Sequence, residues 1–160
     1  MTDVLKVASY LCQRYKDTFG KQMDEMKLHK LLYFTQREAI IQTGSPMFPE
    51  KFKAWKYGPV IPQIRKHYKD NTLDFVLGDK DAEKYQSVFD KVFEVYAPKS
   101  SWSLSTLTHC EYSWTKARQG YDADAHCDVD IETDDIRIDA ERVKKRRVMI
   151  DLWNKMKQNA

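Results

Sequence analysis

The chain has 160 residues, the length of one ordinary domain, and a mean hydropathy of −0.69 with 32% charged residues indicates a well-hydrated surface. Its 4 Trp, 9 Tyr and 7 Phe supply enough apolar bulk for a core without a disulfide or structural metal, which excludes a disordered chain. No apolar run reaches the length of a membrane span, no secretion signal is recognisable, and the three cysteines lack paired spacing, so we expect a cytoplasmic protein.

The net charge of +3 is unevenly distributed along the chain. Residues 122–135 carry seven acidic side chains and no base, whereas residues 136–160 and residues 1–121 each have a net charge of +5. An acidic stretch between basic neighbours indicates either a charged partner or mutual screening within the chain.

Two helices are predicted at the start of the chain. The first begins at Thr2 or Asp3 and ends at Gly20, and the second follows Asp24 as its cap and runs to about Gln42. Apolar residues lie on more than one side of the second helix, so we expect it to be the central helix of the core.

The middle of the chain begins with an aromatic-rich segment. Residues 52–57 alternate apolar or aromatic with polar side chains, which predicts one short extended piece that Gly58-Pro59 ends. A helix is then predicted from Pro59 or Pro62 to Tyr68.

Further helices are predicted over residues 81–97, from Ser101 or Ser103 to Cys110, and over residues 113–119. In the acidic stretch, residues 129–138 alternate apolar and acidic side chains and favour a small hairpin; the alternative is a helix that begins at Thr133. The expected fold is therefore mainly α, a single compact multi-helix domain over residues 1–160 with a minor β element.

A last helix is predicted over residues 139–158, with Asp139 as its cap. Its middle, residues 144–147, is a run of four bases that we expect to stay solvated. Its tip is expected to bury Val148, Met149, Leu152, Trp153 and Met156.

Most sequence signatures of catalysis are missing, so we expect neither an enzyme nor a cofactor. There is no phosphate-binding glycine loop, no dinucleotide fingerprint, no nucleophile elbow and no paired-histidine zinc helix. The dipeptides His109-Cys110 and His126-Cys127 offer zinc-ligand chemistry, but adjacent helical side chains point about 100° apart and grip one ion poorly. We therefore expect no metal site.

The four-base run at residues 144–147 makes nucleic-acid binding an alternative function. No helix-turn-helix glycine turn precedes it, so a solvated face is favoured over a DNA contact.

A group of aromatic and basic residues favours a binding function. Tyr33, Trp55, Lys56, Tyr57 and Arg65 lie in or beside predicted turns, and Trp, Tyr and Arg are the residues that anchor protein interfaces. Any one ring taken alone is better explained as core, so the hypothesis concerns the group.

Three stretches in order resemble one family. They are Lys27-Leu28-x-Lys30-Leu31-Leu32-Tyr33-Phe34-x-Gln36, then Phe52-x-Ala54-Trp55-x-Tyr57-Gly58-Pro59-Val60-x-Pro62, then Leu104-Ser105-x-Leu107-Thr108-His109 with Trp114 and Arg118 following. The pattern covers residues 4–120 and resembles the Panacea antitoxin domain, a family of SocA-like and phage-associated GepA-like proteins.

The resemblance implies a mostly helical antitoxin that neutralises a toxin encoded beside it by stoichiometric binding; the alternative is an adaptor that delivers the toxin to a protease. His109 and Arg118 fit either a structural or a binding role, and we assign the first to the scaffold and the second to the partner surface. The expected partner-binding residues are Tyr33, Trp55, Lys56, Tyr57, Arg65 and Arg118. The expected scaffold residues are Leu31, Leu32, Ala54, Gly58, Pro59, Thr108, His109 and Trp114. Residues 122–135 and 139–158 match no part of the pattern, so partner specificity is a role open to them.

Overall fold

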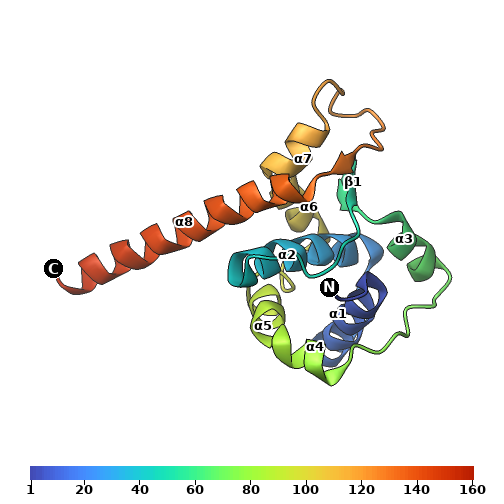
Figure 1. The fold of residues 1–160 in the computed structure, drawn as a ribbon, viewed down its shortest axis with the longest axis horizontal. Helices are drawn as coiled ribbons and strands as arrows, with labels where there is room; N and C mark the ends of the chain where they lie inside the picture. The colour runs from blue at the N-terminus through green and yellow to red at the C-terminus, as the bar shows by residue number, and fades with distance from the viewer.

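Helix α2 (Glu25–Thr43) runs through the middle of the molecule, and nearly every side chain from Lys27 to Ile40 is buried. A computed structural model describes all 160 residues. Helices α1, α4 and α5 lie on one side of α2, and α6, α7 and the strands lie on the other (Figure 1). The other helices are α1 (Val4–Phe19), α3 (Pro62–Lys69), α4 (Asp79–Lys84), α5 (Gln86–Val95), α6 (Ser101–His109), α7 (Tyr112–Ala117) and α8 (Thr133–Gln158). The prediction of a mainly α fold with a minor β element is confirmed.

The first two helices begin and end where the sequence predicts. The Asp3 carboxylate accepts a hydrogen bond from the Leu5 N–H at the start of α1, and that of Asp24 accepts one from the Lys27 N–H. Gly20 and Gly44 end the two helices in left-handed conformations. The prediction that the second helix is central is also confirmed.

The strands form one small sheet in the order β2-β1-β3. Strand β1 (Phe52–Trp55) pairs antiparallel with β2 (Gly58–Val60) through a tight turn and with β3 (Asp130–Ile131) on its other edge. The prediction that Gly58-Pro59 ends the extended segment is wrong, because these two residues form the second strand of a hairpin.

The helix predicted over residues 81–97 is two helices, α4 and α5. Tyr85 separates them with non-helical backbone angles (φ −106°, ψ 13°), and its ring is buried. The apolar stripe of α5 packs against α2.

The hairpin predicted in residues 129–138 is absent. Only Asp130 and Ile131 are extended, and they pair with β1, while α8 begins at Thr133 as in the alternative prediction. Asp139 therefore lies inside α8. Its carboxylate instead accepts hydrogen bonds from the Tyr112 and Ser113 N–H groups at the start of α7, at 2.8 and 2.9 Å.

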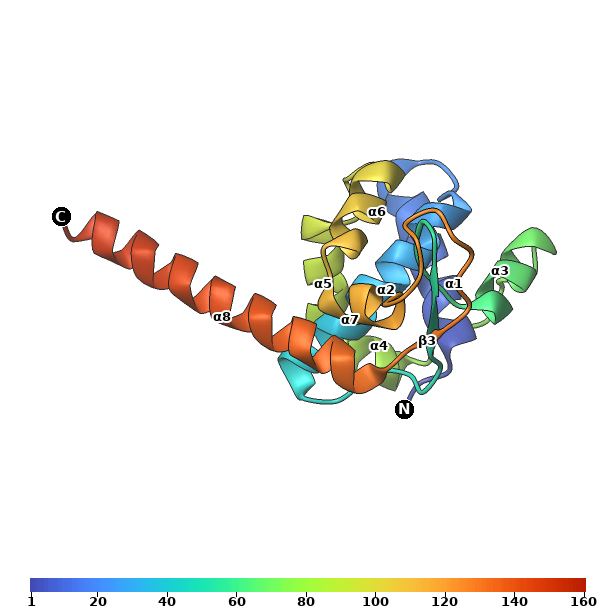
Figure 2. The ribbon, with the colours of Figure 1, turned by 90° about the horizontal axis from the view of Figure 1, so that it is seen from above.

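The second half of α8 leaves the body of the molecule (Figures 1 and 2). The prediction that its tip is buried is wrong, because no other element packs against it. Its exposed apolar side chains are Val148, Met149, Ile150, Leu152, Trp153 and Met156. None of the helices, this one included, combines the length and apolarity needed to span a bilayer.

Candidate partner-binding site

The β1–β2 hairpin, which is formed by the second sequence motif, is held by side chains from the first and the third. Four of its backbone carbonyls each accept a hydrogen bond from a side chain on a surrounding helix. The donors and acceptors are Arg118 to Ala54 (2.9 Å), Trp114 to Trp55 (2.9 Å), Ser105 to Tyr57 (2.6 Å) and Lys30 to Pro59 (3.3 Å). This arrangement explains why motifs far apart in the sequence belong together, since the first supplies one donor and the third supplies three to the backbone of the second.

Gly58 is required at the turn of this hairpin. Its φ of +115° is a conformation that residues with a side chain rarely adopt. A Cβ there would lie 2.6 Å from both Lys30 Cε and Thr108 Oγ1. The Lys30 side chain therefore lies in contact with the glycine. Burial lowers the pKa of Lys30 to about 7, although the charge of nearby Glu25 opposes that shift.

Arg118 was expected to contact the partner, but it is buried and holds the scaffold together. Besides Ala54, its guanidinium donates to the carbonyls of Asp122, Ala123 and Ala125, and so ties the acidic loop to the hairpin. A folded partner cannot reach a side chain that is 5% exposed, so Arg118 is removed from the partner surface.

The ring of Trp114, which also faces Arg118, is packed against His109. Their ring centroids lie 4.2 Å apart with 14° between the planes. The expected scaffold residues Leu31, Leu32, Ala54 and Thr108 are fully buried around the same hairpin support.

Tyr33 is likewise removed from the partner surface, because its side chain is 0% exposed. Its hydroxyl lies 2.8 Å from Ser113 Oγ and donates toward Glu111 and Asp139 at 3.1 and 3.2 Å. Burial, followed by these two carboxylates, raises its pKa well above the ordinary range. Tyr33 therefore joins α2 to α7 and α8.

Trp55, Lys56, Tyr57 and Arg65 do come together at the surface. They are among the residues that line a pocket of about 190 Å³ between the hairpin, α2 and α3. The Arg65 guanidinium lies 5.6 Å from the centre of the Trp55 ring. We call these four residues the hairpin face.

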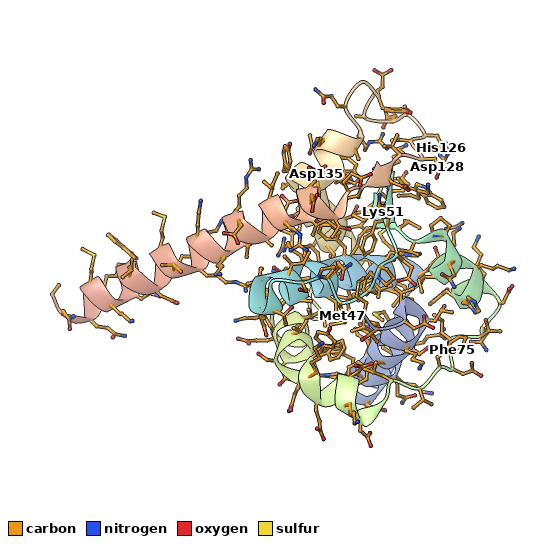
Figure 3. The ribbon with its side chains drawn as sticks, viewed as in Figure 1. Met47, Lys51, Phe75, His126, Asp128 and Asp135 are labelled. Atoms are coloured by element: carbon orange, nitrogen blue, oxygen red, sulfur yellow. The ribbon has the colours of Figure 1, made fainter.

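Neighbouring elements stiffen the hairpin face. Trp55 Nε1 donates to Asp128 at 3.0 Å, and Tyr57 packs edge-on against Trp102 with ring centroids 5.6 Å apart. Asp128 and His126 sit on the loop that precedes β3 (Figure 3), and His126 completes the pocket wall. The contribution of this loop could not be foreseen, because it lies about 70 residues further along the chain.

The pocket is also lined by polar residues of α2 that were not predicted from the sequence. Glu25 accepts a hydrogen bond from Arg65 at 2.8 Å, and its carboxylate lies 3.8 Å from His29 Nε2. His29 is buried with no hydrogen-bond partner on either nitrogen, and burial, with the positive charges of Lys30 and Arg65, lowers its pKa to about 3. The neutral form is therefore the one present, despite the nearby carboxylate. The pair His29-Lys30, set between Leu28 and Leu31 in the predicted central helix, was the available signal.

The chemistry of the hairpin face suits recognition of another protein. It combines two aromatic rings, Trp55 and Tyr57, with Arg65, and Trp, Tyr and Arg are the residue types enriched at interface hot spots. The structure contains no group of three His, Cys, Asp or Glu side chains placed to hold a metal ion.

Comparison with known proteins gives one family and one curated relative. The family model "Antitoxin SocA-like, Panacea domain" matches residues 28–115, which include the residues that hold the hairpin from α2, α6 and α7, except Arg118. Antitoxin SocA of Caulobacter vibrioides (strain NA1000 / CB15N) is 31% identical over 55 residues, which are 34% of this chain and 29% of that protein. The match thus spans less than a third of that relative. No solved structure is significantly similar to the chain.

Proposed function

The chain belongs to the SocA-like antitoxin family with a Panacea domain, and from this premise we propose that it is an antitoxin that neutralises a protein toxin by direct, stoichiometric binding. The hairpin face is the proposed contact surface. The observation behind this proposal is the set of four hydrogen bonds that surrounding side chains donate to carbonyls of the hairpin.

A preformed hairpin suits a binder because little conformational entropy is lost when a partner docks. Tyr57, at 48% exposed, and the half-buried Trp55 offer ring surface, while Lys56 and Arg65 offer charge. This is a binding surface that needs no proton transfer or nucleophile. The proposal accordingly assigns no reaction to the chain.

Co-expression tests the proposal. With the product of the adjacent toxin gene, the chain should restore growth, and the two proteins should elute together from a sizing column at micromolar concentration. Separate elution without rescue would reject the antitoxin function. Rescue that disappears in protease-deficient cells would favour delivery of the toxin to a protease over masking.

The contact surface is tested by Tyr57→Ala. Loss of a hot-spot tyrosine should weaken toxin binding about tenfold or more, measured by titration calorimetry. Tyr121→Ala is the matched control, because Tyr121 is exposed to the same extent (47%) but lines a different surface hollow. Equal affinities for the two variants would exclude the hairpin face as the contact.

A further inference from the structure

The part of α8 beyond Arg147, residues 148–158, has no neighbour in the structure; we call it the α8 tail. Two perpendicular views show it standing away from the body (Figures 1 and 2), and every one of its side chains is exposed. Six of these eleven side chains are large and apolar, with exposed fractions from 51% to 70%. Single exposed apolar residues are ordinary, but a contiguous set on one segment marks an interaction site.

Four of the six apolar side chains form a stripe with helical spacing, and Val148 and Ile150 flank it. Met149, Trp153 and Met156 follow at intervals of four and three residues, and Leu152 lies beside them. Asn154 and Gln158 occupy the opposite side. This is the pattern of a helix that lays one face into a groove of a partner.

The direction of the α8 tail is fixed where it leaves the body. Arg147 donates two hydrogen bonds to the carboxylate of Glu38 on α2, both at 2.9 Å, and Glu38 is 1% exposed. Val143, one turn earlier, is the last buried apolar residue of α8. The stripe therefore lies on a helix whose preceding turns are fixed to the body of the molecule.

The net charge around the stripe indicates which kind of molecule covers it. Residues 144–158 carry six bases and one acid, a net charge of +5, and of these bases only Arg147 is paired within the chain, with Glu38. A second copy of the same segment would bring two such charges together, which opposes self-association. Nucleic acid would satisfy the bases but leave the apolar stripe in water, whereas an acidic protein satisfies both.

We propose that the α8 tail docks as a helix into an apolar groove, rimmed by carboxylates, on the toxin that this chain neutralises. The inference rests on the proposed function and adds a second contact, separate from the hairpin face. Met149 and Trp153 are the central anchors, and the bases before and after them pair with the acidic rim.

Two double variants of the full chain test the proposal. M149E/W153E places two carboxylates in the stripe, and N154E/Q158E places the same number, with the same spacing, on the opposite side of the helix just after them. All four positions are exposed in the free protein, so both variants should melt at the same temperature. M149E/W153E should bind the product of the adjacent toxin gene about 30-fold more weakly or worse, and N154E/Q158E within about threefold of wild type.

Each alternative gives a distinct result. Wild-type binding with equal loss, or no loss, in both variants would overturn the docking proposal while leaving the antitoxin function intact. Failure of the wild type to bind would reject the antitoxin function itself. A wild-type dimer in sedimentation that M149E/W153E converts to a monomer would assign the stripe to a second copy. Salt-sensitive binding to duplex DNA, with toxin affinity unchanged by M149E/W153E, would assign the α8 tail to nucleic acid and overturn the proposal.

Discussion

Lys30 and Gly58 show how two residues depend on each other's size. The Lys30 side chain passes close to Gly58, where the hairpin has no side chain, and its ammonium group donates to the Pro59 carbonyl. A buried ammonium with a single hydrogen bond at 3.3 Å is costly, and its lowered pKa reflects that burial. This hydrogen bond ties α2 to the backbone next to Lys56 and Tyr57.

Gly58→Ala should therefore destabilise the protein by about 3 kcal/mol, because a methyl group meets both the positive φ and two atoms at 2.6 Å. Urea unfolding measures this loss.

Gly78→Ala is the control for Gly58→Ala, since a Cβ at Gly78 meets nothing within 4 Å and its φ is negative. Its loss should stay below about 1 kcal/mol. Equal losses would show that the fit between Lys30 and Gly58 contributes nothing to stability.

Some of the expected partner contacts are exposed and others are buried. The sequence alone does not show whether a single aromatic or basic residue is buried. Trp55, Tyr57 and Arg65 lie at the surface, while Tyr33 and Arg118 are interior. Arg118 is buried because loop carbonyls and the hairpin converge on it. Those acceptors come from folding of the whole chain, so local pattern could not distinguish the two groups.

At the level of elements, α7 is capped by a residue of another helix. Asp139 of α8 accepts two backbone hydrogen bonds at the start of α7 and one from the Tyr33 hydroxyl of α2. One carboxylate thus joins three helices. A six-residue helix is too short to be stable alone, so this contact is expected to hold it in place.

Asp139→Ala should cost about 2–4 kcal/mol, since it leaves buried donors without an acceptor. The free energy of unfolding in urea gives the value. Asp134→Ala, at an exposed carboxylate in the first turn of the same helix, should cost less than about 1 kcal/mol. A loss at Asp139 no larger than at Asp134 would contradict the role of Asp139.

The elements that sequence predicted well are those with local signals. Helices α1 and α2 have a capping aspartate, a periodic apolar face and a terminal glycine, all within one segment. Strand β3 and the start of α8 were mistaken because Asp130 and Ile131 pair with β1, nearly 80 residues earlier. Alternation of apolar and acidic residues in 129–138 fits that single strand followed by a helix as well as it fits a hairpin.

At the scale of the whole molecule, a tightly packed body carries a helix that is only partly supported. The same apolar periodicity marks the buried face of α5 and the stripe of the α8 tail. Periodicity predicts a helix with one apolar face but does not say whether the chain itself supplies the surface that covers it. The prediction of a buried tip was wrong for this reason.

Hydrogen exchange should separate body from tail. Amides of residues 150–158 should exchange at least about 100-fold faster than those in the middle of α2, because an unsupported helix end opens locally. Mass spectrometry of the free chain measures this difference, and addition of the toxin should slow exchange in the tail. Protection equal to α2 in the free chain would mean that the tail is already covered.

The manner in which the hairpin is held has a consequence for how this protein can change. All four supports act on main-chain carbonyls, so the side chains of Lys56 and Tyr57 at the tip take no part in these hydrogen bonds. Mutations at these two positions can therefore change the proposed contact surface and leave the four hydrogen bonds in place. Such a separation allows new specificities to evolve on an unaltered framework.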